Sequence, residues 1–211
     1  MKVKVTQDTT WNRALNAARR TAGKPMLDKE PTEGWRKMAL MAEHSPIKLV
    51  EYTIMFEDLR QWVGVHLLRH EHTLPFIHTQ RVDRRADIEA LTDKVMAIVS
   101  EDIKNDPDFN RRDYLLQGQP NDQDFVVNAQ TLINISRKRL CSCASKETRE
   151  AWHAVKAAIA EIDPVMAAFM VPNCVYRGFC PERDSCGYWT GKRFERELNE
   201  YRNLIGRGKN V

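Results

Sequence analysis

The amino-acid sequence predicts an α+β fold. Helical and strand patterns are mixed along the chain without the regular strand–helix–strand rhythm that would indicate a parallel sheet. The 211 residues suffice for one sizeable domain, or for one domain with an extension. The composition, with 42% hydrophobic and 29% charged residues, is that of an ordinary globular protein.

The first part of the chain predicts one strand followed by two helices. Residues 2–6 alternate in polarity, as a short strand does. Residues 10–20 carry apolar positions at helical spacing after a plausible N-cap, Thr10. Residues 23–34 contain two prolines and two glycines and read as a loop, whereas 35–44 predict a helix that Ser45-Pro46 ends.

The middle of the chain predicts a strand and two helices. Residues 47–56 are rich in β-branched and aromatic side chains, which favours a strand. Residues 59–70 have helical apolar spacing up to Pro75, after which the chain is expected to be extended. Residues 87–103 predict one amphipathic helix. Its apolar face is expected to comprise Ile88, Leu91, Val95, Ile98 and Val99.

The last part of the chain predicts a polar loop, a strand and three helices. Residues 104–123 are polar, and residues 124–140 begin as a strand and become helical near Asn128. Residues 145–162 predict a strong helix, and Pro164 starts a shorter one. The tail from Pro172 holds three of the five cysteines, so we expect a domain over 1–171 and a cysteine-containing extension over 172–211.

Several functional classes are disfavoured by composition. No apolar run approaches the ~20 residues that span a bilayer, and the N-terminus lacks the apolar region of a signal peptide. An odd number of cysteines, five, fits reduced thiols, so a cytoplasmic protein without a membrane partner is expected. A net charge of +4, from 33 basic and 29 acidic residues, does not indicate a strongly basic nucleic-acid module.

The stretch RHEHTLPFIHTQR, residues 69–81, crowds positive and titratable side chains behind an apolar helix. Arg69 and Arg81 are permanent cations with planar donor forks that suit phosphate groups. Lone arginines are usually solvated surface residues, but Arg69 directly follows a segment that is expected to be buried, where a charge needs a partner. No nucleophile elbow, Walker loop or Rossmann fingerprint is present, so phosphate binding would use arginine side chains.

The cysteines give a weaker signal. The pattern Cys141-x-Cys143 and Cys174-x5-Cys180-x5-Cys186 contains no C-x-x-C pair of the kind typical of zinc sites. Reduced buried or loop thiols are therefore expected, and no metal site.

Taken together, these stretches resemble the flavin-dependent thymidylate synthases over about residues 35–165. Arg69-His70 opens the arginine-histidine-arginine motif of that family, and Thr79 and Arg81 stand at the offsets of its serine and final arginine. Residues 43–54 resemble the family's histidine-Ser/Thr-Pro segment, and residues 127–140 resemble its helix that ends in a substrate-binding arginine.

The resemblance implies a fold with a small antiparallel sheet flanked by helices. It implies a transferase that reductively methylates dUMP to dTMP, with FAD as cofactor and with NADPH and methylenetetrahydrofolate as co-substrates. No protein cysteine attacks the pyrimidine in such enzymes, which fits the absence of a nucleophile motif. They are homotetramers whose active sites are shared between subunits.

The resemblance also assigns roles to individual residues. Arg139 would be catalytic, stabilising negative charge on the pyrimidine. The residues that would bind dUMP are His66, Thr79, Gln80, Arg81, Arg112 and Arg139. The residues that would contact FAD are His44, Ser45, Arg69, His70, Glu71, Asn128 and Asn134.

Three departures from the family pattern leave other functions open. Glu71 replaces an arginine, and a carboxylate would repel a pyrophosphate unless it turned to a neighbour such as Arg84 or Arg85. Ile77 replaces a glutamate and His66 a glutamine, so the alternative is methylation or hydroxymethylation of another pyrimidine nucleotide, such as dCMP.

A non-catalytic nucleic-acid-binding protein is the third hypothesis. It rests on the basic clusters 81–85, 110–112 and 136–139. Interspersed acids and the lack of aromatic stacking motifs count against it, so a nucleic-acid partner is not expected.

Overall fold

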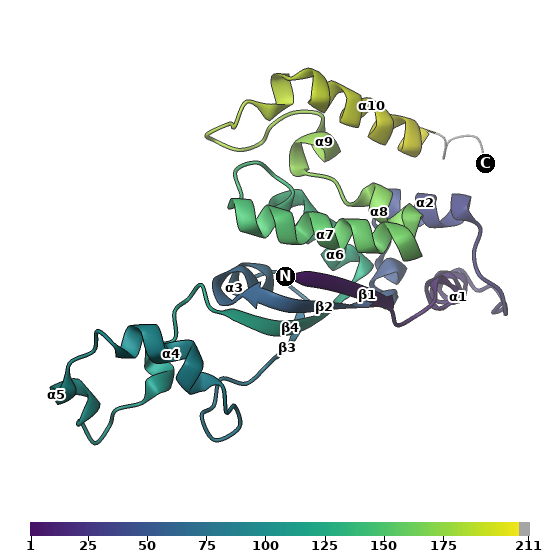
Figure 1. Cartoon of the computed structure of the whole chain (residues 1–211). Helices are drawn as coiled ribbons and strands as arrows, with labels where there is room; N and C mark the ends of the chain where they lie inside the picture. The colour runs from purple at the N-terminus through teal and green to yellow at the C-terminus, as the bar shows by residue number, and fades with distance from the viewer. Residues whose placement is uncertain (207–211) are drawn as a thin grey trace.

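A four-stranded antiparallel sheet lies at the centre of the computed structural model, which describes residues 1–206 (Figure 1). The strand order is β1-β2-β4-β3. The strands are β1 (Lys2–Gln7), β2 (Glu51–Arg60), β3 (Leu74–Ile77) and β4 (Pro120–Asn128). In the central pair, Tyr52 stands opposite Val127 and Ile54 opposite Phe125.

The two central strands bury alternate side chains, because successive residues of a strand point to opposite faces. Tyr52, Ile54 and Phe56 of β2 are fully buried, as are Phe125 and Val127 of β4. Burial of each such side chain stabilises the fold by roughly 1.5–3 kcal/mol. This face of the sheet is therefore the floor of the hydrophobic core.

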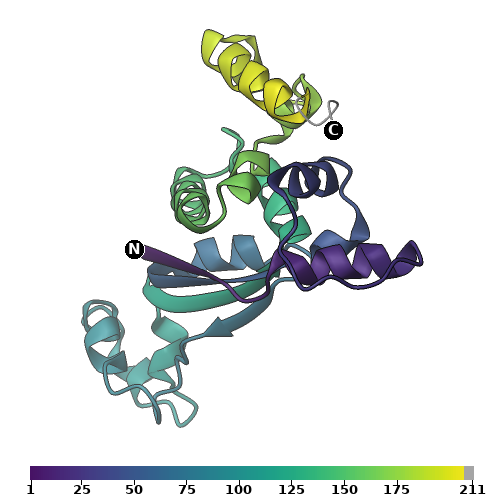
Figure 2. The same ribbon diagram turned by 90° about the vertical axis from the view of Figure 1, so that its right-hand side faces the viewer.

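Helices cover that face in two layers (Figures 1 and 2). The inner layer is α6 (Ala129–Arg139), α7 (Lys146–Ile162) and α8 (Pro164–Phe169). The outer layer is α9 (Asn173–Arg177) and α10 (Lys192–Gly206), and Phe194 and Tyr201 of α10 join the same core. At the end of the sheet lie α1 (Trp11–Thr21), α2 (Glu33–Met41) and the 3-10 helix Ser45–Leu49.

A buried carboxylate, Asp163, ties four of these elements together. It caps α8 by accepting from the backbone N–H of Met166 at 3.0 Å. It also accepts from the indole of Trp11 at 2.6 Å, the hydroxyl of Tyr52 at 2.9 Å and the guanidinium of Arg36 at 3.3 Å. Burial and the charge of Asp163 raise the pKa of Tyr52, so this hydroxyl stays a donor.

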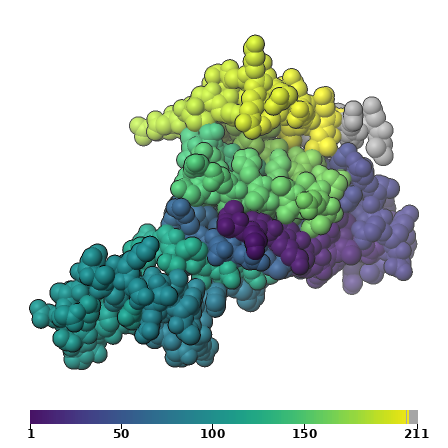
Figure 3. All heavy atoms as spheres, in the orientation of Figure 1, coloured from purple at the N-terminus to yellow at the C-terminus, as the bar shows by residue number. Residues whose placement is uncertain are grey.

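Residues 78–119 form an arm that projects from the body of the molecule (Figures 1 and 3). The arm contains α4 (Ile88–Met96), α5 (Glu101–Lys104) and the 3-10 helix Arg111–Tyr114. Arg85 donates to the side chain of Asn121 at 2.8 Å, and Asn121 donates to the backbone carbonyl of His78 at 2.9 Å. These bonds fasten the base of the arm to β4.

Most of the predicted elements are confirmed, including the first strand, the helix over 10–20 and the strand-to-helix change at Asn128. Three predictions were wrong. The strand expected over 47–56 begins only at Glu51, because the 3-10 helix Ser45–Leu49 comes first and buries Ile47. The strand β4 begins at Pro120, inside the segment expected to be a polar loop.

The single helix expected over 87–103 is also wrong, because α4 ends at Met96. Ile98 is 84% exposed, and the buried positions are Ile88, Thr92 and Met96. Residues 97–100 interrupt the expected helix, and a separate short helix, α5, follows without any buried residue.

Residues 207–211, the end of the expected extension, lie outside the described part of the chain. Within residues 1–206, no helix is both long and apolar enough to cross a membrane.

Candidate functional site

The end of α3 (Gln61–Leu68) meets the end of α6 at a group of four predicted site residues. We call His66, Arg69, His70 and Arg139 the α3–α6 cluster. Arg139 donates from Nε to Nε2 of His70 at 3.1 Å and from a terminal nitrogen to the carbonyl of His66 at 2.7 Å. The structure thus brings together residues 69 positions apart in the sequence.

The electrostatics of the cluster favour a neutral imidazole beside a guanidinium. Burial, and then the charges of Arg139 and Arg69, lower the pKa of His70 to about 4. Neutral His70 can therefore accept the hydrogen bond that Arg139 donates. Burial and Arg69 also lower the pKa of Arg139, which stays a cation.

Arg139 keeps donors for a ligand. A guanidinium carries five N–H groups, and the bonds to His66 and His70 use two of them. The remaining groups can form a two-pronged contact with a carbonyl or an anion. Because Arg139 is half-buried, such a contact would be stronger than one on an open surface.

His66 itself is held by two residues that the sequence did not single out. The ring of Trp62 packs edge-on against the imidazole at 5.4 Å between centroids, and Thr148 of α7 lies 3.4 Å from its Nδ1. Trp62 stands one helical turn before His66; the helical apolar spacing of residues 59–70 indicates this, although it assigns Trp62 no role in the site. No sequence signal links Thr148 to His66.

The start of α6 carries the predicted residue Asn128 and touches the segment that follows α3. The side chain of Asn128 caps the helix by accepting from the N–H of Thr131 at 2.9 Å. The hydroxyl of Thr131 lies 3.2 Å from the backbone carbonyl of Glu71, to which it donates. Glu71 is therefore anchored through its backbone.

The carboxylate of Glu71 forms no ion pair within residues 1–206, so it does not turn to Arg84 or Arg85 in this structure. Arg85 instead pairs with Asp87 at 2.8 Å.

His44, Ser45 and Asn134 lie on another side of α6. Gln130 donates both to Asn134 at 3.2 Å and to Glu43, which precedes His44. His44 and Ser45 line a cavity of about 490 Å³ between α1 and α2. Burial raises the pKa of Glu43, but hydrogen bonds from Arg137 and Gln130 outweigh it and leave the pKa below its ordinary value.

The remaining predicted residues, Thr79, Gln80, Arg81 and Arg112, belong to the arm. Arg81 is exposed and forms a two-pronged ion pair with Asp83 at 2.9 and 2.7 Å. The guanidinium of Arg112 has no hydrogen bond within the described residues. Val82, which follows Arg81, and Arg111, which precedes Arg112, line the same cavity of about 700 Å³. No hydrogen bond or ion pair in residues 1–206 joins these arm residues to the α3–α6 cluster, so one chain presents the predicted site in separate parts.

The neutral state of His70 predicts a pH dependence of folding stability. The pKa of His70 is about 4 in the folded chain, against an ordinary 6.5. Between these values the unfolded chain binds a proton that the folded chain does not, so stability should fall as the pH is lowered from about 6.5 to 4.

Urea titrations of wild type and His70→Gln across this range test the prediction, because the variant should lose part of the slope. His72→Asn, which removes an exposed imidazole at a position with φ of 59°, is the control. Equal slopes in wild type and His70→Gln would contradict the prediction.

The sequence matches no protein-family model and no curated protein. The structure, by contrast, matches two solved structures of flavin-dependent thymidylate synthase ThyX from Helicobacter pylori, both with FAD and dUMP. The first is 15% identical with a TM-score of 0.61, and the match covers 81% of the present chain and 100% of that chain. The second is 14% identical with a TM-score of 0.62, and the match covers 81% and 99% of the two chains.

At this level of identity the likeness concerns the arrangement of the backbone. The predicted α+β fold with a small antiparallel sheet and flanking helices is confirmed. The chain has the fold of the flavin-dependent thymidylate synthases.

Proposed function

We propose that the chain is a diverged flavin-dependent thymidylate synthase, which converts dUMP to dTMP. Methylenetetrahydrofolate would donate the carbon and NADPH the reducing equivalents. The fold supports this proposal, because the matched structures hold FAD and dUMP. The observation that carries it is Arg139, a half-buried guanidinium fixed by His66 and His70 with N–H groups to spare.

The donor set of this chain fits a flavin dinucleotide. Arg69 supplies permanent positive charge for a pyrophosphate. Close by in the chain, Thr73 has a buried hydroxyl without a hydrogen-bond partner, as a group awaiting a ligand would. Only the backbone carbonyl of Glu71 is held, by the hydroxyl of Thr131, and the side chain is exposed. The carboxylate is therefore free to point away from a bound anion.

We assign FAD contacts to seven residues. They are His44, Ser45, Arg69, His70, Glu71, Asn128 and Asn134. Bound flavin would supply reversible two-electron reduction. The chain's own part is to orient the partners and to exclude water, which side chains on the ends of α3 and α6 can do because rigid helices position them.

For the nucleotide, we assign the phosphate to Arg81 and Arg112 together with Thr79 and Gln80. Arg81 would exchange its exposed partner Asp83 for the phosphate. Arg139 would donate to a pyrimidine carbonyl oxygen and bind it more tightly as negative charge develops there. His66, whose carbonyl already accepts from Arg139, would lie beside the base.

In a homotetramer with shared active sites, the arm of one copy would lie against the α3–α6 cluster of another copy. Exposed apolar side chains on β3 and α3 support this assembly. Leu74, Phe76 and Ile77 of β3 are 60%, 64% and 36% exposed, and Val65 of α3 is 49% exposed. Side chains of this kind are usually covered in stable oligomers.

A cytoplasmic location is proposed with this activity. The five cysteines are free thiols, which persist in a reducing compartment.

The proposed reaction is tested by mass spectrometry of the nucleotide product. Purified protein with FAD, NADPH and methylenetetrahydrofolate should convert dUMP to dTMP, and dUMP should stimulate NADPH oxidation. Parallel incubation with dCMP separates the two nucleotide hypotheses, since a methylated or hydroxymethylated cytosine product would favour the alternative. No product from either nucleotide would count against both.

The basic clusters give little support to nucleic-acid binding. Arg81, Arg85 and Arg111 are paired with Asp83, Asp87 and Asp93. Paired charges release few counterions on binding a polyanion.

Arg112 gives a prediction for nucleotide affinity. Arg112→Ala should weaken dUMP binding by about 1.5–3 kcal/mol, or roughly 10–150-fold in Kd, because a charge-assisted contact to phosphate is lost. Calorimetric titration with dUMP in the presence of FAD measures this. Arg84→Ala, which removes another exposed charge from the arm, is the control. The same Kd for Arg112→Ala and wild type would show that Arg112 does not touch the nucleotide.

A further inference from the structure

All five cysteines of the chain gather in one region, although they come from three segments. Cys141 and Cys143 follow α6, Cys174 lies in α9, and Cys180 and Cys186 belong to the loop between α9 and α10. All five are free thiols. Thiols scattered by chance over 211 residues would not be expected to converge in this way.

Four of these cysteines line one cavity. Cys141, Cys174, Cys180 and Cys186 share it with Leu140, Pro172 and Trp189 among others. Its volume of about 10 Å³ is near the lower limit for a single water molecule, so it suits one atom-sized ion rather than an organic ligand.

Cys143 adjoins this set of four without lining the cavity. It is exposed, its Sγ lies 3.8 Å from the backbone carbonyl of Asp184, and the thiols of Cys141 and Cys186 are its neighbours.

We propose that Cys141, Cys174, Cys180 and Cys186 bind one Zn²⁺ ion. Four cysteine sulfurs form the closed tetrahedral set of a structural zinc site, and soft thiolates select this ion over Mg²⁺ or Ca²⁺. No group of three or more His, Cys, Asp or Glu side chains in residues 1–206 is arranged to hold a metal ion as it stands. Binding must therefore draw the sulfur atoms together, with loss of the thiol protons.

The cysteine spacing in the sequence predicts no metal site, whereas the folded chain offers one. The C-x-x-C pair is missing because the four ligands come from three segments, and only the folded chain brings them to one cavity. The segment that must move, between α9 and α10, is a loop in which Cys186 is exposed and Cys180 half-buried.

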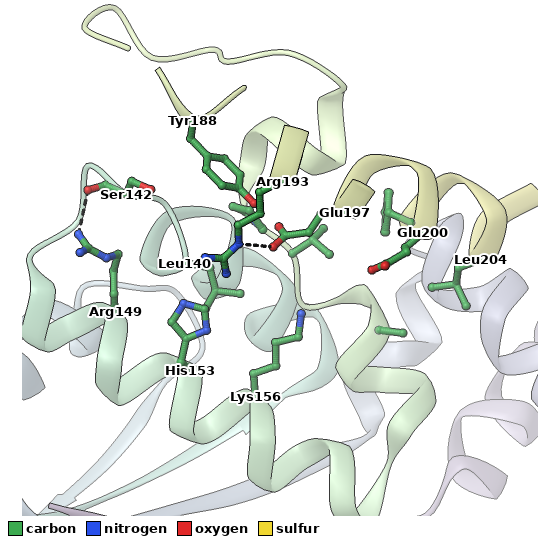
Figure 4. A pocket seen from close by; sticks show the side chains of 14 residues that line it. Leu140, Ser142, Arg149, His153, Lys156, Tyr188, Arg193, Glu197, Glu200 and Leu204 are labelled. Atoms are coloured by element: carbon green, nitrogen blue, oxygen red, sulfur yellow. Dashed lines mark hydrogen bonds and ion pairs between the residues drawn. The ribbon is translucent and has the colours of Figure 1, made fainter. Parts of the chain in front are cut away.

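The ion would fasten the outer helical layer to the end of α6. Lys138 and Glu182 already form an ion pair between these parts at 3.1 Å. The loop also leads into the wall of a cavity of about 640 Å³, where Tyr188, Arg193 and Glu197 face His153 and Lys156 of α7 (Figure 4). Zinc would thus set the position of that wall, whatever the enzyme's substrate.

Metal analysis of the purified full-length protein tests the site. Wild type should contain one zinc per chain, and so should Cys143→Ser, the matched control. Cys180→Ser and Cys186→Ser, which alter side chains outside the buried core, should lose most of the zinc. A strong chelator should lower the Tm of wild type and of Cys143→Ser, and substitution with Co²⁺ should give thiolate-to-cobalt charge-transfer absorbance in both.

Three results would overturn the assignment. One is metal-free wild-type protein that takes up no Zn²⁺ and keeps five titratable thiols in its presence. Another is the same zinc content in Cys180→Ser, Cys186→Ser and wild type. The third is iron with acid-labile sulfide in place of zinc. None of these readouts depends on flavin or nucleotide binding, so failure here would leave the proposed reaction untouched.

Discussion

Replacing Arg139 with alanine should lower kcat by about 10²–10³-fold, the usual effect of removing one donor that stabilises developing negative charge. The dissociation constant for dUMP should change much less, because the phosphate contacts assigned to Arg81 and Arg112 remain. Arg139 suits this role because His66 and His70 fix it, so little reorganisation is needed when charge develops. Steady-state kinetics together with dUMP titration measure both quantities.

The control for Arg139 is Arg196→Ala, which removes an exposed charge from α10. It should leave both quantities unchanged. A thermal melt of each variant checks that the fold is retained. If Arg139→Ala raised the Kd for dUMP while kcat stayed at the wild-type value, Arg139 would be an anchor and not a catalytic residue.

Replacing Asp163 with alanine should destabilise the fold by about 3–5 kcal/mol, the usual cost of removing one partner from a buried ion pair. The side chain is 1% exposed, and its loss leaves donors on Trp11, Tyr52 and Arg36 without their acceptor. Urea unfolding should show a lower midpoint with an unchanged slope.

Asp163→Asn should fall between alanine and wild type, because one amide oxygen still accepts while the charge opposite Arg36 is lost. Asp28→Ala, at an exposed position, should have no effect. A midpoint for Asp163→Ala within error of wild type would mean that the four elements hold together without this network.

Local signals in the sequence suffice for much of the fold. Pro164 begins a helix, and Asn128 caps the helix that follows a strand, because each of these residues acts on its immediate neighbours. The end of α4 could not be predicted in this way. Residues 97–100 continue the helical apolar pattern, but Ile98 on that face is 84% exposed, so burial does not extend the helix.

In the candidate site, too, contacts between sequence neighbours could be predicted and contacts between distant segments could not. The motif around Arg69 and His70 could be identified from the sequence, because its residues are neighbours. Its contact with Arg139 depends on α3 and α6 lying side by side, which no spacing within one segment reveals. The four-cysteine cavity was missed for that reason as well, since its ligands are recognisable only after the outer helices have packed.

We expect the ends of α3 and α6 to bind flavin next to a pyrimidine nucleotide. The most direct measurement is the flavin absorbance spectrum of the purified protein during titration with FAD, followed by dUMP. We expect saturable FAD binding with a spectral shift, a further shift on addition of dUMP, and loss of that second shift in Arg139→Ala. A protein whose addition leaves the spectrum of FAD unchanged at every concentration would contradict the claim.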